Sequence, residues 1–73
     1  MYYVYLIIRQ DKTYIGYTDN LIRRLKEHKA TKQELIYYEA YKSEMDARTR
    51  ERMLKQRGQT VRRLKERIKL SLV

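Results

Sequence analysis

The 73-residue sequence contains no cysteine, no proline, no tryptophan and no phenylalanine, and it has a single histidine. Without cysteine, neither a disulfide framework nor a thiolate zinc site can hold the fold together. One histidine likewise excludes a metal centre built from several imidazole rings. No apolar run approaches the roughly 20 residues of a membrane-spanning helix, and the first residues lack the basic start of a signal peptide. We therefore expect one small domain over residues 1–73, in the cytoplasm, with no membrane partner.

What the sequence has in excess is positive charge. Eighteen lysine and arginine residues oppose nine acidic residues, which gives a formal net charge of +9 and a pI near 10. Such a charge is typical of a nucleic-acid-binding protein, and equally of a small ribosome-associated protein. All eight aromatic residues are tyrosines, whose polar ends suit surfaces that stack on bases or bind phosphate. The composition favours a nucleic-acid partner and allows a nucleoid-associated location.

Three segments have the composition of β-strands. Residues 2–8 form a continuous apolar and aromatic run, which predicts a strand buried on both faces. A polar break at residues 9–12 separates it from a second short strand over residues 13–17, so a hairpin is expected. Residues 35–41 form the third predicted strand.

Capping residues define the predicted helices. Thr18 or Asp19 can cap a first helix that runs to about Lys29. A capping box at residues 43–46 opens a second helix, which ends near Gly58.

The last helix is predicted to begin at Thr60, with one apolar stripe formed by Val61, Leu64, Ile68 and Leu72. The order is therefore β-β-α-β-α-α. This order predicts an α+β fold with a three-stranded, mostly antiparallel sheet flanked by three helices.

The hairpin register brings particular side chains together. If Ile8 pairs with Thr13, then Tyr5 lies opposite Gly16 and on the same face as Tyr14, as its diagonal neighbour. Two rings at these positions are close enough to meet, and Gly16 leaves open space above the Tyr5 ring. An ordinary cross-strand tyrosine pair would have the same spacing.

The first helix places two polar residues toward the domain. At 100° per residue, His28 shares the apolar stripe and Arg24 lies beside it, whereas the adjacent Arg23 points into solvent. Arg24 can also be read as a long side chain that follows the edge of the core, and His28 as a hydrogen-bonded core histidine.

The second helix carries a glutamate on its apolar stripe. Ala47, Glu51 and Leu54 share one face, and Lys55 follows Glu51 by one turn. Because an unpaired buried carboxylate is costly, Glu51 needs a partner. Pattern alone leaves two interpretations open: an ion pair with Arg24 or Lys55, or a divalent cation.

Several motifs together resemble the GIY-YIG nuclease superfamily. They are Tyr3-Val4-Tyr5, then eight residues later Tyr14-Ile15-Gly16, Arg24 and His28 on the next helix, and Ala47, Glu51 and Lys55 in an Ala-x3-Glu-x3-Lys arrangement. In the first motif Tyr3-Val4 stands where Gly-Ile is usual. The resemblance covers residues 2–70 and is closest to the minimal standalone UvrC-type branch.

This resemblance implies a metal-dependent DNA endonuclease that uses one Mg²⁺ or Mn²⁺ ion. Glu51 would bind the metal, and Arg24 would hold the scissile phosphate. Tyr5 would help to activate the attacking water, and Tyr14 would orient it. His28 would position this cluster or carry a proton, and Gly16 would be structural.

The chain also departs from the family pattern. The segment over residues 30–34 is short where relatives carry a longer basic one, and the asparagine that many relatives have late in the chain is missing. The residues expected to bind DNA are Lys29, Lys32, Lys55, Arg62 and Arg63, unless they are part of solvated helix faces. These departures leave two alternatives: a DNA-binding or adaptor module that cuts poorly, or a subunit completed by a partner protein or a second copy.

Overall fold

The computed structural model describes residues 1–31 and 33–72. In this part of the chain there are three strands, β1 (Tyr2–Arg9), β2 (Lys12–Thr18) and β3 (Leu35–Tyr41). It also contains three α-helices and a short 3-10 helix, namely α1 (Leu21–Glu27), α2 (Glu44–Gln56), α3 (Gly58–Arg67) and η1 (Lys69–Leu72). The strand order is β2-β1-β3, and both pairs are antiparallel. The predicted α+β class and element order are confirmed.

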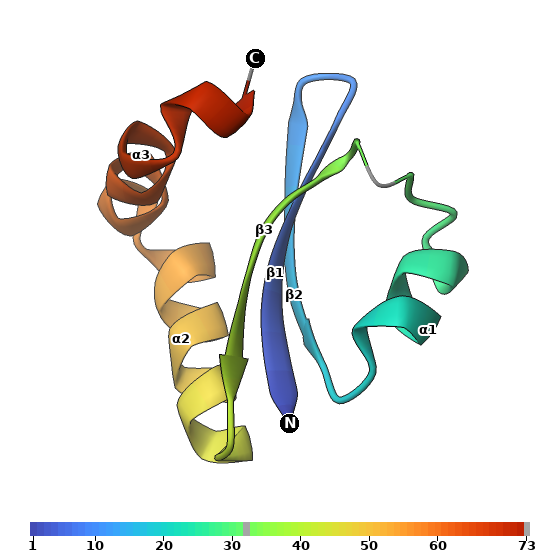
Figure 1. Cartoon of the computed structure of the whole chain (residues 1–73). Coiled ribbons are helices and arrows are strands. Elements are labelled where there is room, and N and C mark those ends of the chain that lie inside the picture. Colours follow the sequence, from blue (N-terminus) through green and yellow to red (C-terminus); the bar gives the residue numbers. More distant parts are fainter. Residues whose placement is uncertain (32, 73) are drawn as a thin grey trace.

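The sheet separates two unequal helical layers. Helices α2 and α3 lie along one side of the sheet and the short α1 lies on the other (Figure 1). The main core forms under α2 and α3, where Val4 and Leu6 of the central strand pack with Leu54 and Leu64. From Val4 to Ile7 each residue of β1 is at most 3% exposed, so β1 is buried on both faces, as predicted.

The β1–β2 hairpin is tighter than the predicted four-residue break. Its turn consists of Gln10 and Asp11, whose φ angles are 52° and 65°. Positive φ at both central residues is the geometry of a turn that matches the twist of the flanking strands. The predicted register is confirmed, because Tyr5 lies opposite Gly16.

Helix α1 begins and ends differently from the prediction. Its N-cap is Asn20, whose side chain accepts the Arg23 N–H at 3.0 Å, and not Thr18 or Asp19. The Thr18 hydroxyl instead bonds the backbone of Asn20. The helix ends at Glu27, before the predicted Lys29.

Helix α3 also begins earlier than predicted, at Gly58 and not at Thr60, and no side chain caps it. It ends at Arg67, so Leu72 of the predicted stripe lies in the 3-10 helix η1 and not in α3. Ser43 caps α2 as expected by accepting the Asp46 N–H. None of the helices in residues 1–31 and 33–72 has the length and apolar character needed to cross a membrane.

A carboxylate network ties β3 to α2. The Glu39 carboxylate accepts hydrogen bonds from the Tyr37 hydroxyl at 2.8 Å and from the Tyr41 hydroxyl. Arg50 donates to both of its oxygens at 3.0 to 3.1 Å. Burial alone would raise the pKa of Glu39, but the hydrogen bonds from Arg50, Tyr41 and Tyr37 outweigh it and lower the pKa. Burial and the Glu39 contact raise the pKa of Tyr41 to about 12.

The substitution Glu39→Gln is expected to lower the free energy of unfolding by about 1.5–3 kcal/mol, because it weakens charge-assisted hydrogen bonds that are largely shielded from water. A lowered carboxyl pKa adds stability above the pKa of the unfolded state, and this stability disappears as the pH falls through the folded pKa. The unfolding free energy of the parent should therefore fall more steeply than that of the variant below about pH 4. Denaturant titrations at several pH values measure both effects.

The matched control is Glu66→Gln on the exposed surface of α3, which should change stability by less than about 0.5 kcal/mol. Equal effects of the two substitutions would show that the Glu39 network does not stabilise the domain.

Candidate active site

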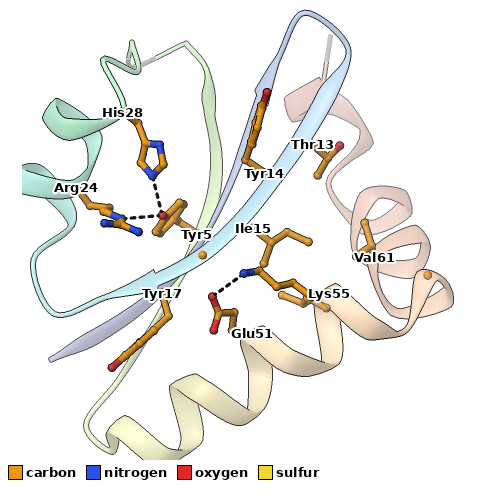
Figure 2. Close-up of a pocket in the computed structure, with 13 residues that line it drawn as sticks. Tyr5, Thr13, Tyr14, Ile15, Tyr17, Arg24, His28, Glu51, Lys55 and Val61 are labelled. Atoms are coloured by element: carbon orange, nitrogen blue, oxygen red, sulfur yellow. Dashed lines mark hydrogen bonds and ion pairs between the residues drawn. The ribbon is translucent and has the colours of Figure 1, made fainter.

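The Tyr5 hydroxyl is the meeting point of two functional side chains from α1 and its C-cap (Figure 2). Arg24 Nε donates to the Tyr5 oxygen at 3.2 Å, and His28 Nε2 lies 3.2 Å from the same oxygen. Because Arg24 donates to this oxygen, the hydroxyl proton of Tyr5 is available to a neutral His28 Nε2. The hydrogen bond with Tyr5 is the main cause that raises the pKa of Arg24.

Gly16 makes this position of Tyr5 possible. A Cβ atom at Gly16 would overlap the Tyr5 hydroxyl and would lie 2.5 Å from Cζ and 3.1 Å from Cε2 of the ring. The sequence predicted that Gly16 leaves open space above the Tyr5 ring; this is wrong, because the Tyr5 ring itself fills the space that a side chain at residue 16 would occupy. The ring of Tyr5 also meets His28 edge-on at 6.0 Å between centroids.

An ion pair that sequence reasoning missed fixes the end of α1. Arg9 Nη2 donates to the backbone carbonyl of His28 at 2.9 Å, and its Nε donates to Glu34 at 3.0 Å. Glu34 also accepts the Thr31 N–H at 2.8 Å. The hydrogen bond from Thr31 and then the one from Arg9 lower the pKa of Glu34. The only local signal was the Thr-x-x-Glu spacing of a capping box.

Helix α2 supplies the single acidic side chain among the described residues that line the cleft. Glu51 shares its face with the buried Ala47 and Leu54, as predicted, and its side chain is 22% exposed. Its partner is Lys55, whose Nζ lies 3.2 Å from Glu51 Oε2. The carboxylate nearest to Arg24 is instead Glu27, at 3.7 Å.

One open cleft of about 950 Å³ is lined both by the cluster of Tyr5, Arg24 and His28 and by the Glu51–Lys55 ion pair. Tyr5 and Arg24 lie on one side of strand β2, and Glu51 lies on the other (Figure 2). Tyr14 lines the same cleft but is 45% exposed, and its hydroxyl points away from Tyr5. The structure thus brings the five predicted catalytic residues to one cleft, but it does not join them in one hydrogen-bond network. The ring that meets Tyr5 is that of His28, and not that of Tyr14.

A third tyrosine, Tyr17, also lines the cleft and was not singled out from the sequence. Its hydroxyl donates to Glu44 at 2.6 Å and accepts from Arg48 Nε at 3.2 Å. The Arg48 guanidinium lies 5.5 Å from the ring centroid, in cation–π contact. This cluster links the edge strand β2 to α2 beside Glu51.

The residues expected to bind DNA fall in different places. Lys29 is exposed just after α1, and Lys32 lies outside the described residues. Arg62 lines a hollow that shares Gly58 and Val61 with the cleft. Arg63, although adjacent to Arg62, lines a different hollow, which shares only Gly58 with the cleft.

The donor set suits a hard divalent cation held mainly by water. In residues 1–31 and 33–72, no group of three acidic, histidine or cysteine side chains gathers at one point. Glu51 nevertheless offers an accessible carboxylate beside open space, and its present partner Lys55 is 54% exposed. Mg²⁺ commonly binds through one or two carboxylates and several waters, so the residues present fit such an ion.

Residues 1–66 match the GIY-YIG catalytic domain. The chain therefore belongs to the GIY-YIG family, a class of nuclease-type domains. Comparisons with curated proteins and with solved structures give no match.

The substitution Gly16→Ala is expected to displace the Tyr5 ring and to break its contacts with Arg24 and His28. Forcing a methyl group against a buried ring should also lower the free energy of unfolding by about 1–3 kcal/mol. Denaturant unfolding measures the stability, and the NMR signals of the His28 imidazole report the loss of the cluster.

The control is Gly58→Ala, since nothing lies within 4 Å of a Cβ atom at Gly58. Alanine in a helix is favoured over glycine by up to about 1 kcal/mol, so this variant should be neutral or more stable. An unchanged His28 spectrum in Gly16→Ala would contradict the role assigned to Gly16.

Proposed function

We propose that this domain is a metal-dependent DNA endonuclease of the UvrC-type branch that hydrolyses phosphodiester bonds, in the repair or processing of structured DNA. The single observation that carries the proposal is the cleft itself. It holds Arg24 and the Tyr5 hydroxyl on one side of β2 and the Glu51 carboxylate on the other. A scissile phosphate between them would meet a cation, a proton acceptor and a metal-binding carboxylate.

In this proposal Tyr5 and His28 handle the proton of the attacking water. Transfer of the Tyr5 proton to a neutral His28 Nε2 would leave a phenolate oxygen, which would accept the proton that the attacking water loses. As the water oxygen bonds to phosphorus, the bond to the leaving oxygen would break; His28 would release its proton to solvent, and the leaving oxygen would take up a proton from solvent. Arg24 Nε already donates to that oxygen, so it would stabilise the negative charge that develops there. The remaining guanidinium donors of Arg24 would hold the phosphate, and the exposed Tyr14 hydroxyl would orient water or phosphate at the mouth of the cleft.

Glu51 would hold the Mg²⁺ or Mn²⁺ ion. When bound, such an ion supplies Lewis acidity and makes a coordinated water more acidic. The position of Glu51 on the buried face of α2, beside Ala47 and Leu54, would fix the carboxylate against the cleft.

DNA would be gripped through its phosphates, without sequence preference. The hollow that shares Gly58 and Val61 with the cleft is lined by three basic residues of α3 and η1, Arg62, Lys65 and Lys69, and by one acidic residue, Glu66. Lys65 is positioned there by donating to the Thr13 hydroxyl at 2.8 Å. We propose that this row, together with Lys55, takes over the role of the basic segment that is short in this chain. Lys29 is proposed as a further contact beyond α1.

The second candidate is a DNA-binding or adaptor module that cuts weakly. It is favoured by the Glu51–Lys55 ion pair, which satisfies the carboxylate without a metal. A partner protein or a second copy of the chain that completes the DNA grip belongs to the same candidate. Under either candidate, residues 1–73 act as one domain, and the positive charge suits a cytoplasmic, nucleoid-associated location.

Cleavage of supercoiled, single-stranded and branched DNA in Mg²⁺ or Mn²⁺ tests the function. Glu51→Gln and Arg24→Ala should each reduce the cleavage rate on the order of 10²-fold or more, because each removes charge stabilisation at the reacting phosphate. Arg23→Ala is the matched control, since Arg23 is exposed and paired with Asp19 at 2.9 Å; it should cut at nearly the parental rate. DNA binding without any cleavage by the parent would favour the binding module.

The substitution Arg62→Ala should weaken DNA binding more than Arg63→Ala, although both remove one arginine from the same helix. Arg62, and not Arg63, lines the hollow that shares both Gly58 and Val61 with the cleft. Loss of one phosphate contact should reduce the slope of log affinity against log salt concentration by about 0.9. Fluorescence anisotropy at several salt concentrations measures the slope for each variant, and equal slopes for both would rule out the proposed DNA path.

A further inference from the structure

The cleft contains one carboxylate and more than one cation. Among its described lining residues, Glu51 is the only acidic one, whereas Arg24 and Lys55 are positively charged. The Glu51 carboxylate already has a partner, because Lys55 Nζ lies 3.2 Å from its Oε2 atom (Figure 2). The Glu51 carboxylate, which the proposed function assigns to the metal, is thus neutralised by the Lys55 ammonium.

A divalent cation at Glu51 would lie close to the Lys55 ammonium. Like charges at such a separation repel each other even through water, so the ion binds well only when Lys55 moves away. Lys55 is the more exposed partner of the pair: its side chain is 54% exposed, against 22% for Glu51. Its flexible four-carbon stem allows the ammonium to reach another anion in the same cleft.

DNA supplies that anion. In the free protein, a Lys55 ammonium that leaves Glu51 exchanges its ion pair for contact with water alone. The incoming ion would also add two positive charges to a chain whose net charge is already +9. Both effects disfavour metal binding without DNA. A phosphate bound at Arg24 lies in the cleft that Lys55 lines. It therefore offers the ammonium a new partner and offsets the charge of the ion.

We propose that Lys55 is an exchangeable counter-ion, which neutralises Glu51 in the free protein and moves to the DNA phosphate when the divalent cation binds. This inference rests on the proposed function and deepens it, because it makes metal binding depend on DNA. Coupling of this kind is reciprocal: DNA tightens metal binding by the factor by which the metal tightens DNA binding. Lys55 would thus have two successive partners, the Glu51 carboxylate in the free protein and the DNA phosphate in the complex.

The first test measures Mn²⁺ binding to the DNA-free protein by electron paramagnetic resonance. Lys55→Gln should bind Mn²⁺ about three- to fivefold more tightly than the parent, a factor that matches the strength of a partly exposed ion pair. Glu51→Gln should lose this binding. Lys42→Gln makes the same charge change at an exposed residue outside the cleft, and it should bind Mn²⁺ like the parent.

The second test measures DNA affinity with and without Ca²⁺, by anisotropy of a labelled oligonucleotide that gels show to remain intact. Ca²⁺ should strengthen DNA binding by the parent and by Lys42→Gln about tenfold. The gain should shrink to about threefold or less in Lys55→Gln, because the part of the coupling that came from moving Lys55 is gone. Circular dichroism of each variant checks that it is folded.

The outcomes separate the inference from the proposed function. Unchanged Mn²⁺ affinity in Lys55→Gln would overturn the inference, even if the parent cuts DNA. The inference would also be overturned if Lys55→Gln binds Mn²⁺ more tightly but Ca²⁺ strengthens its DNA binding as much as that of the parent. Lys55 would then only repel the ion and would not move to the DNA. If the parent cuts no DNA while Lys55→Gln behaves as expected, the proposed nuclease fails and the exchange at Glu51 stands.

Discussion

The ring of Tyr5 rests directly on the backbone of Gly16, and the geometry of the cleft depends on this close approach. A side chain at residue 16 would occupy the same volume as the Tyr5 hydroxyl. Because residue 16 is glycine, the Tyr5 hydroxyl can lie where Arg24 and His28 both contact it. Tyr5 is 3% exposed and belongs to the central strand, so its position is fixed from both sides. The side chains of Arg24 and His28, from the short α1 region, thus both contact one buried ring.

The position of β2 at the edge of the sheet explains how one cleft can use both faces. Strand β1 is covered by a neighbour on each side, whereas β2 has a neighbour only on one. Arg24 approaches from the α1 layer and Glu51 from the α2 layer, and they face a common space across the edge strand. In the proposed function, a DNA phosphate at this edge would contact groups from both layers. If Arg24 and Glu51 flanked the central strand β1 in place of the edge strand β2, the sheet would separate them.

Local patterns were sufficient for the elements and for the hairpin register, because side-chain periodicity and turn length act over a few residues. The same patterns placed Arg24 and Glu51 toward the domain. They failed at the start of α1, where Thr18, Asp19 and Asn20 are all good capping residues and the N-cap is Asn20. They also missed the ion pair of Arg9 with Glu34 and the hydrogen bond of Arg9 to the His28 carbonyl, because these residues become neighbours only after the strands have paired.

The sequence by itself therefore determined the element order, the strand that lies buried, and which faces of the helices carry charge into the domain. The tertiary structure alone decided the pairings: Glu51 with Lys55 and not with Arg24, and Tyr5 with His28 and not with Tyr14. Periodicity fixes the direction in which a side chain leaves its own helix or strand. Its partner depends on the distance and the angle at which two such elements pack, and these are set by the whole core.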